Sequence, residues 1–341
     1  MVDLHTHTNY SDGDSTLEQL LKEAEDNCVT ILSITDHDTV NAHKKLKEFD
    51  YSKIYTGKII AGGEFNAIFN NAKIELLGYN FDIDIIDRWC METYNKNSDY
   101  MDLNKEFELM ISTCHKNGVK IDDLTYDLSM GWPIDVILPS IKKYDENKEL
   151  FTDREWNDSN YFFRCCNCNT DFPLYIDFSN QMPNAKAVSD AIRKAGGKVF
   201  LAHLFLYPLR DHMAYLDTLV NENIIDGIEV YHSKFTKEES KILEEYAKKN
   251  NLLISGGTDY HGSKKPGREI GKGYNNINID DSIVINWING GIMKQIYNKL
   301  VRDNIPEIIK SNGENPIISI LNDEKYKEEL EKNCMKNILK R

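Results

Sequence analysis

Histidines and acidic residues recur in this chain where predicted strands end. The first example is the pair His5 and His7, whose i, i+2 spacing points both side chains to the same side of a strand. Five of the nine histidines lie just past such a strand end, which is the edge where α/β barrels and open parallel sheets place their active sites. Imidazole nitrogens and carboxylate oxygens bind divalent ions, so the pattern predicts a site for several metal ions. Its members are His5, His7, Asp12, His37, Glu64, Glu75, His203, Asp259 and His261.

The elements that must position these residues alternate between strand and helix. Strands are predicted at 2–6, 30–35, 58–61, 73–77, 198–201, 227–231 and 252–255. Helices are predicted at 17–24, 104–117, 185–195, 211–223, 237–250 and 283–289. The alternation predicts a parallel sheet, and seven strands suit a small α/β barrel, although a doubly wound sheet has a similar strand count.

The βα pattern is interrupted between residues 80 and 182. This segment is rich in Asp, Asn, Tyr and Lys and has weak periodicity, so we interpret it as an inserted subdomain or lid that sets substrate specificity. The barrel is then assigned to residues 1–79 and 183–294, and a charged helical tail to 295–341. The insertion contains Cys165, Cys166 and Cys168, which either ligate zinc or pack in a core. Their spacing is not that of a zinc finger, and no fourth ligand is evident nearby.

Acidic residues outnumber basic ones, 55 to 41, which gives a formal net charge of −14. A surface of this charge repels phosphate backbones, so we expect no binding of long nucleic acid, although metal ions in a cleft could still capture one phosphate. No run of about 18 apolar residues is present, and the N-terminus lacks the basic start and apolar core of a signal peptide. We therefore expect no membrane association and a cytoplasmic location.

Several separate motifs resemble, in the same order, those of the PHP family (polymerase and histidinol phosphatase). They are Asp3-Leu4-His5-Thr6-His7-Thr8, Ser11-Asp12-Gly13, Thr35-Asp36-His37-Asp38-Thr39, Gly63-Glu64, Ala202-His203 and Gly257-Thr258-Asp259-Tyr260-His261-Gly262. The resemblance runs from Met1 to about Ile279 around the insertion. It implies an α/β fold, a distorted seven-stranded (β/α)7 PHP barrel, with two or three divalent ions of manganese, zinc or iron.

The resemblance also implies a role for each matching residue. The first ion would be bound by His5, His7 and Asp259, and Asp259 could also contact the bridging water. Glu64 would bridge two ions, and His203 would complete the second one. The third ion would be held by Asp12, His37 and His261.

Two positions depart from the family pattern. Glu75 stands where relatives usually have a histidine in a His-x-Leu-Gly-Tyr stretch. A carboxylate there favours harder ions such as Mn²⁺, or leaves the second ion more weakly held. Phe235 stands where relatives often place a second histidine after His232. His232 is then either a contact for the substrate phosphate or a solvated loop histidine.

The chemistry that such ions support is phosphate-ester hydrolysis by an activated water. Our leading hypothesis is a metal-dependent phosphoesterase acting on a nucleotide or an oligonucleotide end, because the motifs look closest to stand-alone PHP phosphoesterases. The leaving-group proton would come from His203, His232 or a water held by the ions. One alternative is a histidinol-phosphate or sugar-phosphate phosphatase. Another is a PHP-like binding or regulatory module without activity.

The tail carries a second resemblance. The stretch from Tyr297 to Pro306 is similar to the opening segment of phosphoribosyl-ATP pyrophosphohydrolase-like proteins. Those proteins continue into a helical bundle whose glutamates bind Mg²⁺, and this chain stops at Arg341, before such a bundle. We expect a non-catalytic remnant, a docking segment or a solvated helical extension.

Overall fold

Seven strands form one sheet whose spatial order follows the chain. Leu4 donates its backbone N–H to the Gly256 carbonyl at 3.1 Å, and Asp259 donates to the His5 carbonyl at 2.8 Å. These bonds join the last strand to the first, so the sheet closes and the predicted seven-stranded α/β barrel is confirmed. The strands are β1 Val2–Asp3, β2 Ile31–Ile34, β3 Lys58–Phe69, β4 Ala72–Tyr79, β5 Lys198–Leu201, β6 Gly227–His232 and β7 Leu253–Gly257.

The structure, a computed structural model, describes residues 1–94, 103–273, 278–284 and 287. The tail at 295–341 lies outside these ranges, as does most of the helix predicted at 283–289. A 3₁₀ turn, Asp281–Val284, stands where that helix was expected to begin. Within the described ranges, no helix combines the length and apolar character that a membrane-spanning segment needs.

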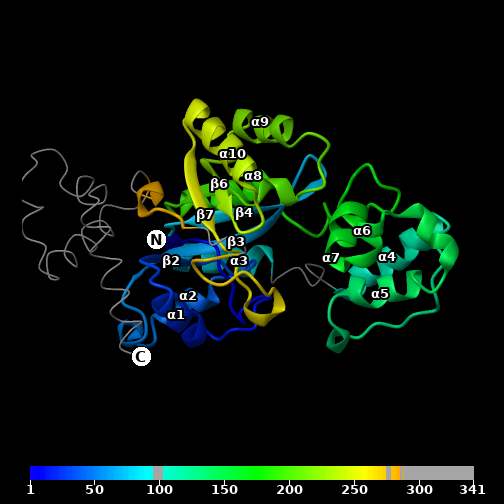
Figure 1. Ribbon diagram of the computed structural model, residues 1–341, viewed down its shortest axis with the longest axis horizontal. Coiled ribbons are helices and arrows are strands. Elements are labelled where there is room, and N and C mark those ends of the chain that lie inside the picture. Colours follow the sequence, from blue (N-terminus) through cyan, green and yellow to red (C-terminus); the bar gives the residue numbers. More distant parts are fainter. Residues whose placement is uncertain (95–102, 274–277, 285–286, 288–341) are drawn as a thin grey trace, which may run out of the picture.

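Helices cover the barrel in two groups (Figure 1). Helices α1 and α2 share one buried apolar cluster with β2, and α3, α8, α9 and α10 share another with β4, β5 and β6. Capping boxes fix two helix starts, Thr16 with Gln19 for α1 and Thr236 with Glu239 for α10. The bounds are α1 Leu17–Asp26, α2 Asn41–Leu46, α3 Ile83–Thr93, α8 Ala185–Lys194, α9 His212–Asn221 and α10 Lys237–Asn250.

Strand β4 runs antiparallel to both of its neighbours, so the prediction of an entirely parallel sheet is wrong here. Asn70 and Asn71 connect β3 to β4 with φ values of 49° and 64°. These are the left-handed values that a two-residue hairpin turn requires and that asparagine tolerates. The hairpin carries β3 well past its predicted end, and Glu64 consequently lies within the strand instead of at its end.

Residues 103–182 build a lobe beside the barrel (Figure 1). Its helices are α4 Leu103–Lys116, α5 Pro133–Ile141, α6 Asp153–Asn157 and α7 Ser159–Phe162, followed by the π-helical turn Phe163–Asn167. Phe107, Ile137 and Phe162 are buried in an apolar cluster of the lobe. Helix α3 instead contributes Ile86 to the cluster of the barrel. The segment predicted as an insertion thus consists of a barrel helix and a lobe.

The lobe rests against the tip of the β3–β4 hairpin. The Tyr175 hydroxyl donates to the Asn71 carbonyl at 2.8 Å. On the next strand, the Lys73 ammonium lies 5.6 Å from the centre of the Phe163 ring, within the range of a cation–π contact. The hairpin therefore links the lobe to the barrel.

Three cysteines of the lobe, Cys114, Cys166 and Cys168, are buried in its apolar cluster. Burial raises the pKa of Cys114 and of Cys168 to about 12, which keeps these thiols protonated at neutral pH. The ligand groups found among the described residues contain only His, Asp and Glu. Of the two roles considered for the cysteines, the structure thus supports packing for Cys166 and Cys168.

Gly257 lies where β7 approaches the chain that follows β1. A Cβ atom at this position would lie 2.4 Å from the His5 backbone nitrogen and 2.8 Å from Asp3 Oδ1. We expect Gly257→Ala to push the two segments apart and to lower the free energy of unfolding by about 1–3 kcal/mol. Urea unfolding beside the exposed control Lys198→Ala tests this, and equal stability of the two variants would contradict it.

Candidate metal centre

All the side chains predicted as metal ligands converge on one place in the barrel. His5 and His7 follow β1, and a bond from the His7 N–H to the Tyr260 carbonyl, 2.8 Å long, holds this segment beside the chain that follows β7. The other predicted ligands lie on loops, within strands or just after strand ends. They are Asp12 and His37 on loops, Glu64 on β3, Glu75 on β4, His203 after β5, and Asp259 and His261 after β7.

Site A consists of His5, His7, Glu64 and Asp259. The Nε2 atoms of His5 and His7 lie 3.1 and 3.2 Å from Glu64 Oε2. The same two nitrogens lie 3.7 and 3.5 Å from Asp259 Oδ1. The ligand atoms of His5, His7 and Glu64 form one group that could hold a divalent ion, and Asp259 Oδ1 lies beside its two imidazole nitrogens.

Site B consists of His7, Asp12, His37 and His261, whose ligand atoms also form one group. His261 Nε2 lies 3.1 Å from Asp12 Oδ2, and His37 Nε2 lies 3.7 Å from Asp12 Oδ1. His7 Nδ1 lies 3.6 Å from Asp12 Oδ1. His7 thus faces site A with one ring nitrogen and site B with the other.

Site C consists of Glu64, Glu75 and His203. His203 Nε2 lies 3.0 Å from Glu64 Oε1 and 3.3 Å from Glu75 Oε2. Burial opposes ionisation of Glu75, but the Arg164 guanidinium lowers the pKa of this carboxyl to about 2. Glu75, the departure from the family pattern, is therefore an ionised carboxylate in the position of a ligand.

Several of these polar atoms are buried without a hydrogen bond. They are both ring nitrogens of His7, Oδ1 of Asp12 and Nδ1 of His37. Burying such atoms without partners costs free energy, and here they lie 3.2–3.7 Å from other candidate ligand atoms. Divalent ions placed among them would satisfy all of these atoms, so the residues present fit a polynuclear metal centre.

Protons must leave the centre when ions bind. Burial opposes the charged form of His5, yet the Glu64 and Glu229 carboxylates raise its pKa to about 10. Burial would raise the pKa of Glu64, but His5 and His37 hold it well below its usual range. The metal-free centre therefore holds ionised Glu64 against protonated His5, and metal binding displaces that proton.

His232 ends β6 beside Asp259. Its Nδ1 accepts the Lys234 backbone N–H at 3.2 Å, so the ring proton is on Nε2, which lies 3.3 Å from Asp259 Oδ2. The ring is buried and packs on Phe235 with a centroid distance of 5.1 Å. Burial holds the pKa of His232 well below its usual range, so the ring is neutral at neutral pH. The alternative of a solvated loop histidine is wrong.

Comparison with known proteins places this geometry in a family. A model of the PHP domain matches residues 3–275. The chain belongs to the PHP domain family. Membership confirms the predicted barrel and the prediction of a metal-dependent phosphoric ester hydrolase.

Solved structures share the PHP fold. A protein described as a metal-dependent phosphoesterase from Bifidobacterium adolescentis aligns with a TM-score of 0.54 and 22% identity, over 84% of this chain and 96% of that one. An amidohydrolase from Chromobacterium violaceum, solved with bound sulfate and no metal, aligns with a TM-score of 0.55 and 18% identity, over 79% of this chain and 89% of that one.

Curated relatives carry the name 5′-3′ exoribonuclease. The Haemophilus influenzae protein is 25% identical over 305 residues, which cover 84% of this chain and 97% of the relative. The Escherichia coli protein, 5′-3′ exoribonuclease Rnm, is 38% identical over 83 residues. That second match spans 24% of this chain and only 28% of the relative.

Sequence reasoning missed the residues that hold the candidate metal ligands in place. Glu229 on β6 contacts His5 Nδ1 at 2.8 Å. Arg268 donates from Nη1 to the Asp259 carboxylate and, at 3.0 Å, to the Asp259 carbonyl. An acidic residue inside an otherwise apolar strand was the available signal for Glu229. Arg268 lies in a loop and gives no comparable signal.

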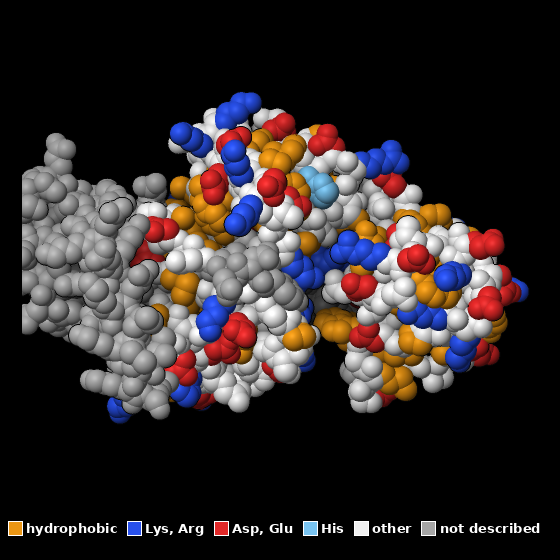
Figure 2. Space-filling model, in the orientation of Figure 1, with side chains coloured by type: hydrophobic (Ala, Val, Ile, Leu, Met, Phe, Trp, Pro, Cys, Tyr) orange, Lys and Arg blue, Asp and Glu red, His pale blue; other side chains and the backbone are white. Residues whose placement is uncertain are grey.

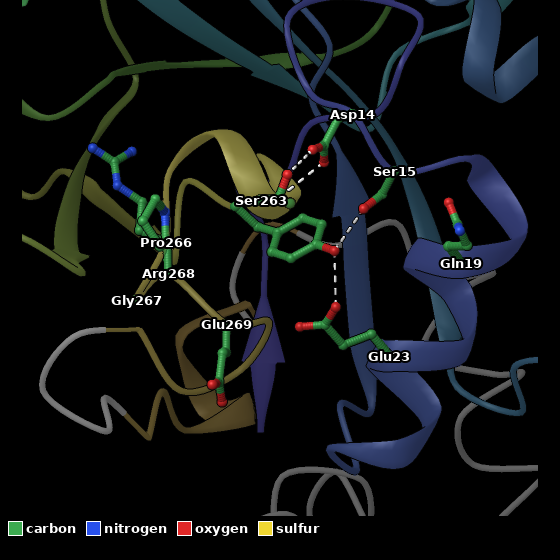
Figure 3. Close-up of a pocket in the computed structure, with 11 residues that line it drawn as sticks. Asp14, Ser15, Gln19, Glu23, Ser263, Pro266, Gly267, Arg268 and Glu269 are labelled. Atoms are coloured by element: carbon green, nitrogen blue, oxygen red, sulfur yellow. Dashed lines mark hydrogen bonds between the residues drawn. The ribbon is translucent and has the colours of Figure 1, made fainter.

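A cavity of about 510 Å³ lies between the two loops that carry Asp12 and His261 (Figure 3). The Tyr260 hydroxyl stands in it, 2.7 Å from Ser15 Oγ and 2.8 Å from Glu23 Oε2. The cavity is therefore next to site B and has a polar lining.

Glu64 contributes to both site A and site C. We expect Glu64→Gln to remove the charge that these sites share and to lower the metal content after Mn²⁺ loading and desalting by at least one ion per chain. Elemental analysis measures this directly. Glu106→Gln, a buried glutamate of the lobe, is the matched control, and equal metal content in the two variants would contradict the assignment of Glu64.

Proposed function

We propose that this PHP protein hydrolyses a phosphate ester of a nucleotide or of an oligonucleotide end. The observation that carries the proposal is the convergence of three ligand sites, in which the buried carboxylate of Glu64 joins site A to site C and the ring of His7 joins site A to site B. The names of the curated relatives, 5′-3′ exoribonucleases, support the choice of substrate class. The ligand roles of the residues in the three sites are part of the proposal.

The chain's own residues would bind and orient the reacting groups. Divalent ions, when bound, supply an activated water and neutralise phosphoryl oxygens. Asp259, held by Arg268 and His232, presents Oδ1 to site A and would orient that water. His203 directs Nε2 to the carboxylates of site C. Because the Lys234 N–H engages Nδ1 of His232 and Asp259 engages its Nε2, we assign His232 to the orientation of Asp259 in place of a direct contact with the substrate phosphate.

Basic side chains beside the centre would hold the negative charge of the substrate. Arg164, from the lobe, lies 3.8 Å from Glu75, and the Lys265 ammonium lies 2.6 Å from His261 Nε2. Partial burial and the nearby Arg268, Arg164 and Lys265 lower the pKa of Lys234 to about 8. Figure 2 shows Lys and Arg side chains gathered where the barrel meets the lobe. We propose that the lobe is the specificity element and closes over the substrate.

The donor chemistry bears on the metal. Site C pairs one imidazole with two carboxylates. Carboxylate oxygens are hard ligands, so this set suits Mn²⁺ or Fe²⁺ better than it suits softer ions. We propose Mn²⁺ as the working ion.

Phosphate release tests the proposed activity. The substrates are adenosine 3′,5′-bisphosphate, 5′-AMP, a short 5′-phosphorylated RNA and histidinol phosphate, in Mn²⁺ buffer with a chelated control. We expect chelator-sensitive release from a nucleotide or the RNA, and at least about a hundredfold loss of kcat in Asp259→Asn. Asp190→Asn, on the exposed side of α8, is the control. Preference for histidinol phosphate, or full activity of Asp259→Asn, would contradict the proposal.

Lys234 predicts a pH dependence of substrate affinity. Its ammonium is charged below its pKa of about 8 and neutral above it. We expect KM to rise above about pH 8, because a positive charge that attracts the substrate is lost. Lys234→Arg should remove this rise, since guanidinium stays charged. Lys241→Arg on the exposed face of α10 is the control, and the same KM rise in both variants would contradict the role of Lys234.

A further inference from the structure

Glu229 is a buried acidic residue in the middle of β6 that belongs to none of the three ligand sites. Its side chain is fully buried, and its neighbours along the strand, Ile228 and Val230, are packed in the apolar cluster of the barrel. A buried carboxylate is stable only where its oxygens accept hydrogen bonds or face a positive charge. Both of them contact a segment that carries a metal ligand.

The first oxygen fixes the ring of His5. Glu229 Oε1 lies 2.8 Å from His5 Nδ1. Because a carboxylate only accepts hydrogen bonds, the proton of the imidazole is held on Nδ1. The proton that metal binding displaces is then the one on Nε2, the nitrogen that faces Glu64 and Asp259 in site A, and its loss leaves the lone pair there. The contact with Glu229 therefore sets the tautomer that a metal ion needs.

The second oxygen fixes the backbone of His203. Glu229 Oε2 accepts the His203 N–H at 2.7 Å. His203 has φ of 23° and ψ of 55°, a left-handed conformation that is strained for a residue with a Cβ. Its Nδ1 is buried and has no hydrogen-bond partner among the described residues, so no hydrogen bond on that side of the ring orients the imidazole. The orientation depends on ring packing and on the backbone, and Glu229 holds the backbone.

We infer that Glu229 is the positioning residue that aligns two metal sites at once, His5 for site A through one oxygen and His203 for site C through the other. The inference rests on the proposed ligand roles of His5 and His203. Sites A and C then depend on the same carboxylate, so that its loss weakens metal binding at both.

Glutamine at this position cannot make both contacts. If its amide oxygen accepts the His203 N–H, its amide nitrogen faces His5 Nδ1 and donates to it. That arrangement moves the His5 proton to Nε2, where it blocks metal binding. If the amide is turned around, its nitrogen meets the His203 N–H, and two donors face each other. Glu229→Gln therefore keeps the size and shape of the side chain but cannot hold both His5 and His203 in the orientation that metal binding needs.

The test compares Glu229→Gln with Glu106→Gln, the buried glutamate of the lobe. Each purified protein is stripped with chelator and titrated with Mn²⁺ and with Zn²⁺ by calorimetry, and its thermal unfolding is measured without metal. We expect Glu229→Gln to bind metal about 10–100-fold more weakly and Glu106→Gln to match the wild type. Unchanged affinity in a folded Glu229→Gln protein would overturn the inference.

A second measurement needs only the wild type. In the Zn²⁺-loaded protein, long-range ¹H–¹⁵N spectra of the histidine rings report which nitrogen of His5 carries the proton. We expect a protonated Nδ1 and a Zn²⁺-bound Nε2, and the reverse assignment would overturn the inference. If the wild type bound no metal, the proposed centre itself would fail. Normal metal binding with no phosphate release would leave Glu229 supported and contradict the proposed activity.

Discussion

A buried carboxylate that must always be balanced by positive charge is the constraint on which the rest of this barrel depends. The oxygens of Glu64 lie 3.0–3.4 Å from ring nitrogens of His5, His7, His37 and His203. Water cannot screen a charge in that position, so protons on the rings or metal ions must compensate it. Because the histidines follow β1, β2 and β5 while Glu64 is on β3, this balance holds four strands in register around one point. The arrangement of these four strands and the chemistry proposed for the centre thus depend on the same electrostatic balance.

The residues that meet in the centre were predictable because most of them stand in short local motifs. His5 and His7 share one side of an extended chain, so no knowledge of the fold was needed to pair them. The topology was harder to predict. The turn at Asn70 and Asn71 reverses the chain after β3, and its two asparagines are a weaker turn signal than Asn-Gly. The sequence therefore indicated which residues meet in the centre but not that β4 enters it antiparallel.

The residues that support the ligands could not be predicted, because their roles depend on contacts between distant segments. Glu229 contacts His5 across 224 positions of the chain. Arg164 contacts Glu75 of the barrel from the lobe, and no sequence periodicity in the lobe distinguishes it from other arginines. Glu229 differs from a solvent-exposed glutamate in a similar strand by its burial, and burial is a property of the folded chain. Local patterns reveal the reactive groups, and only the tertiary structure reveals what orients them.

The β3–β4 hairpin connects the candidate metal centre to the lobe. Along its length it carries Glu64 and Glu75 in the candidate metal centre, and at its tip it contacts the lobe through Asn71 and Lys73. A paired ribbon of two strands transmits displacement more stiffly than a loop does. A displacement of the lobe would therefore be passed along the hairpin to the Glu64 and Glu75 carboxylates, and ions bound there would in turn restrain the lobe. Under the proposed function, substrate selection and metal binding would then be coupled through this one element.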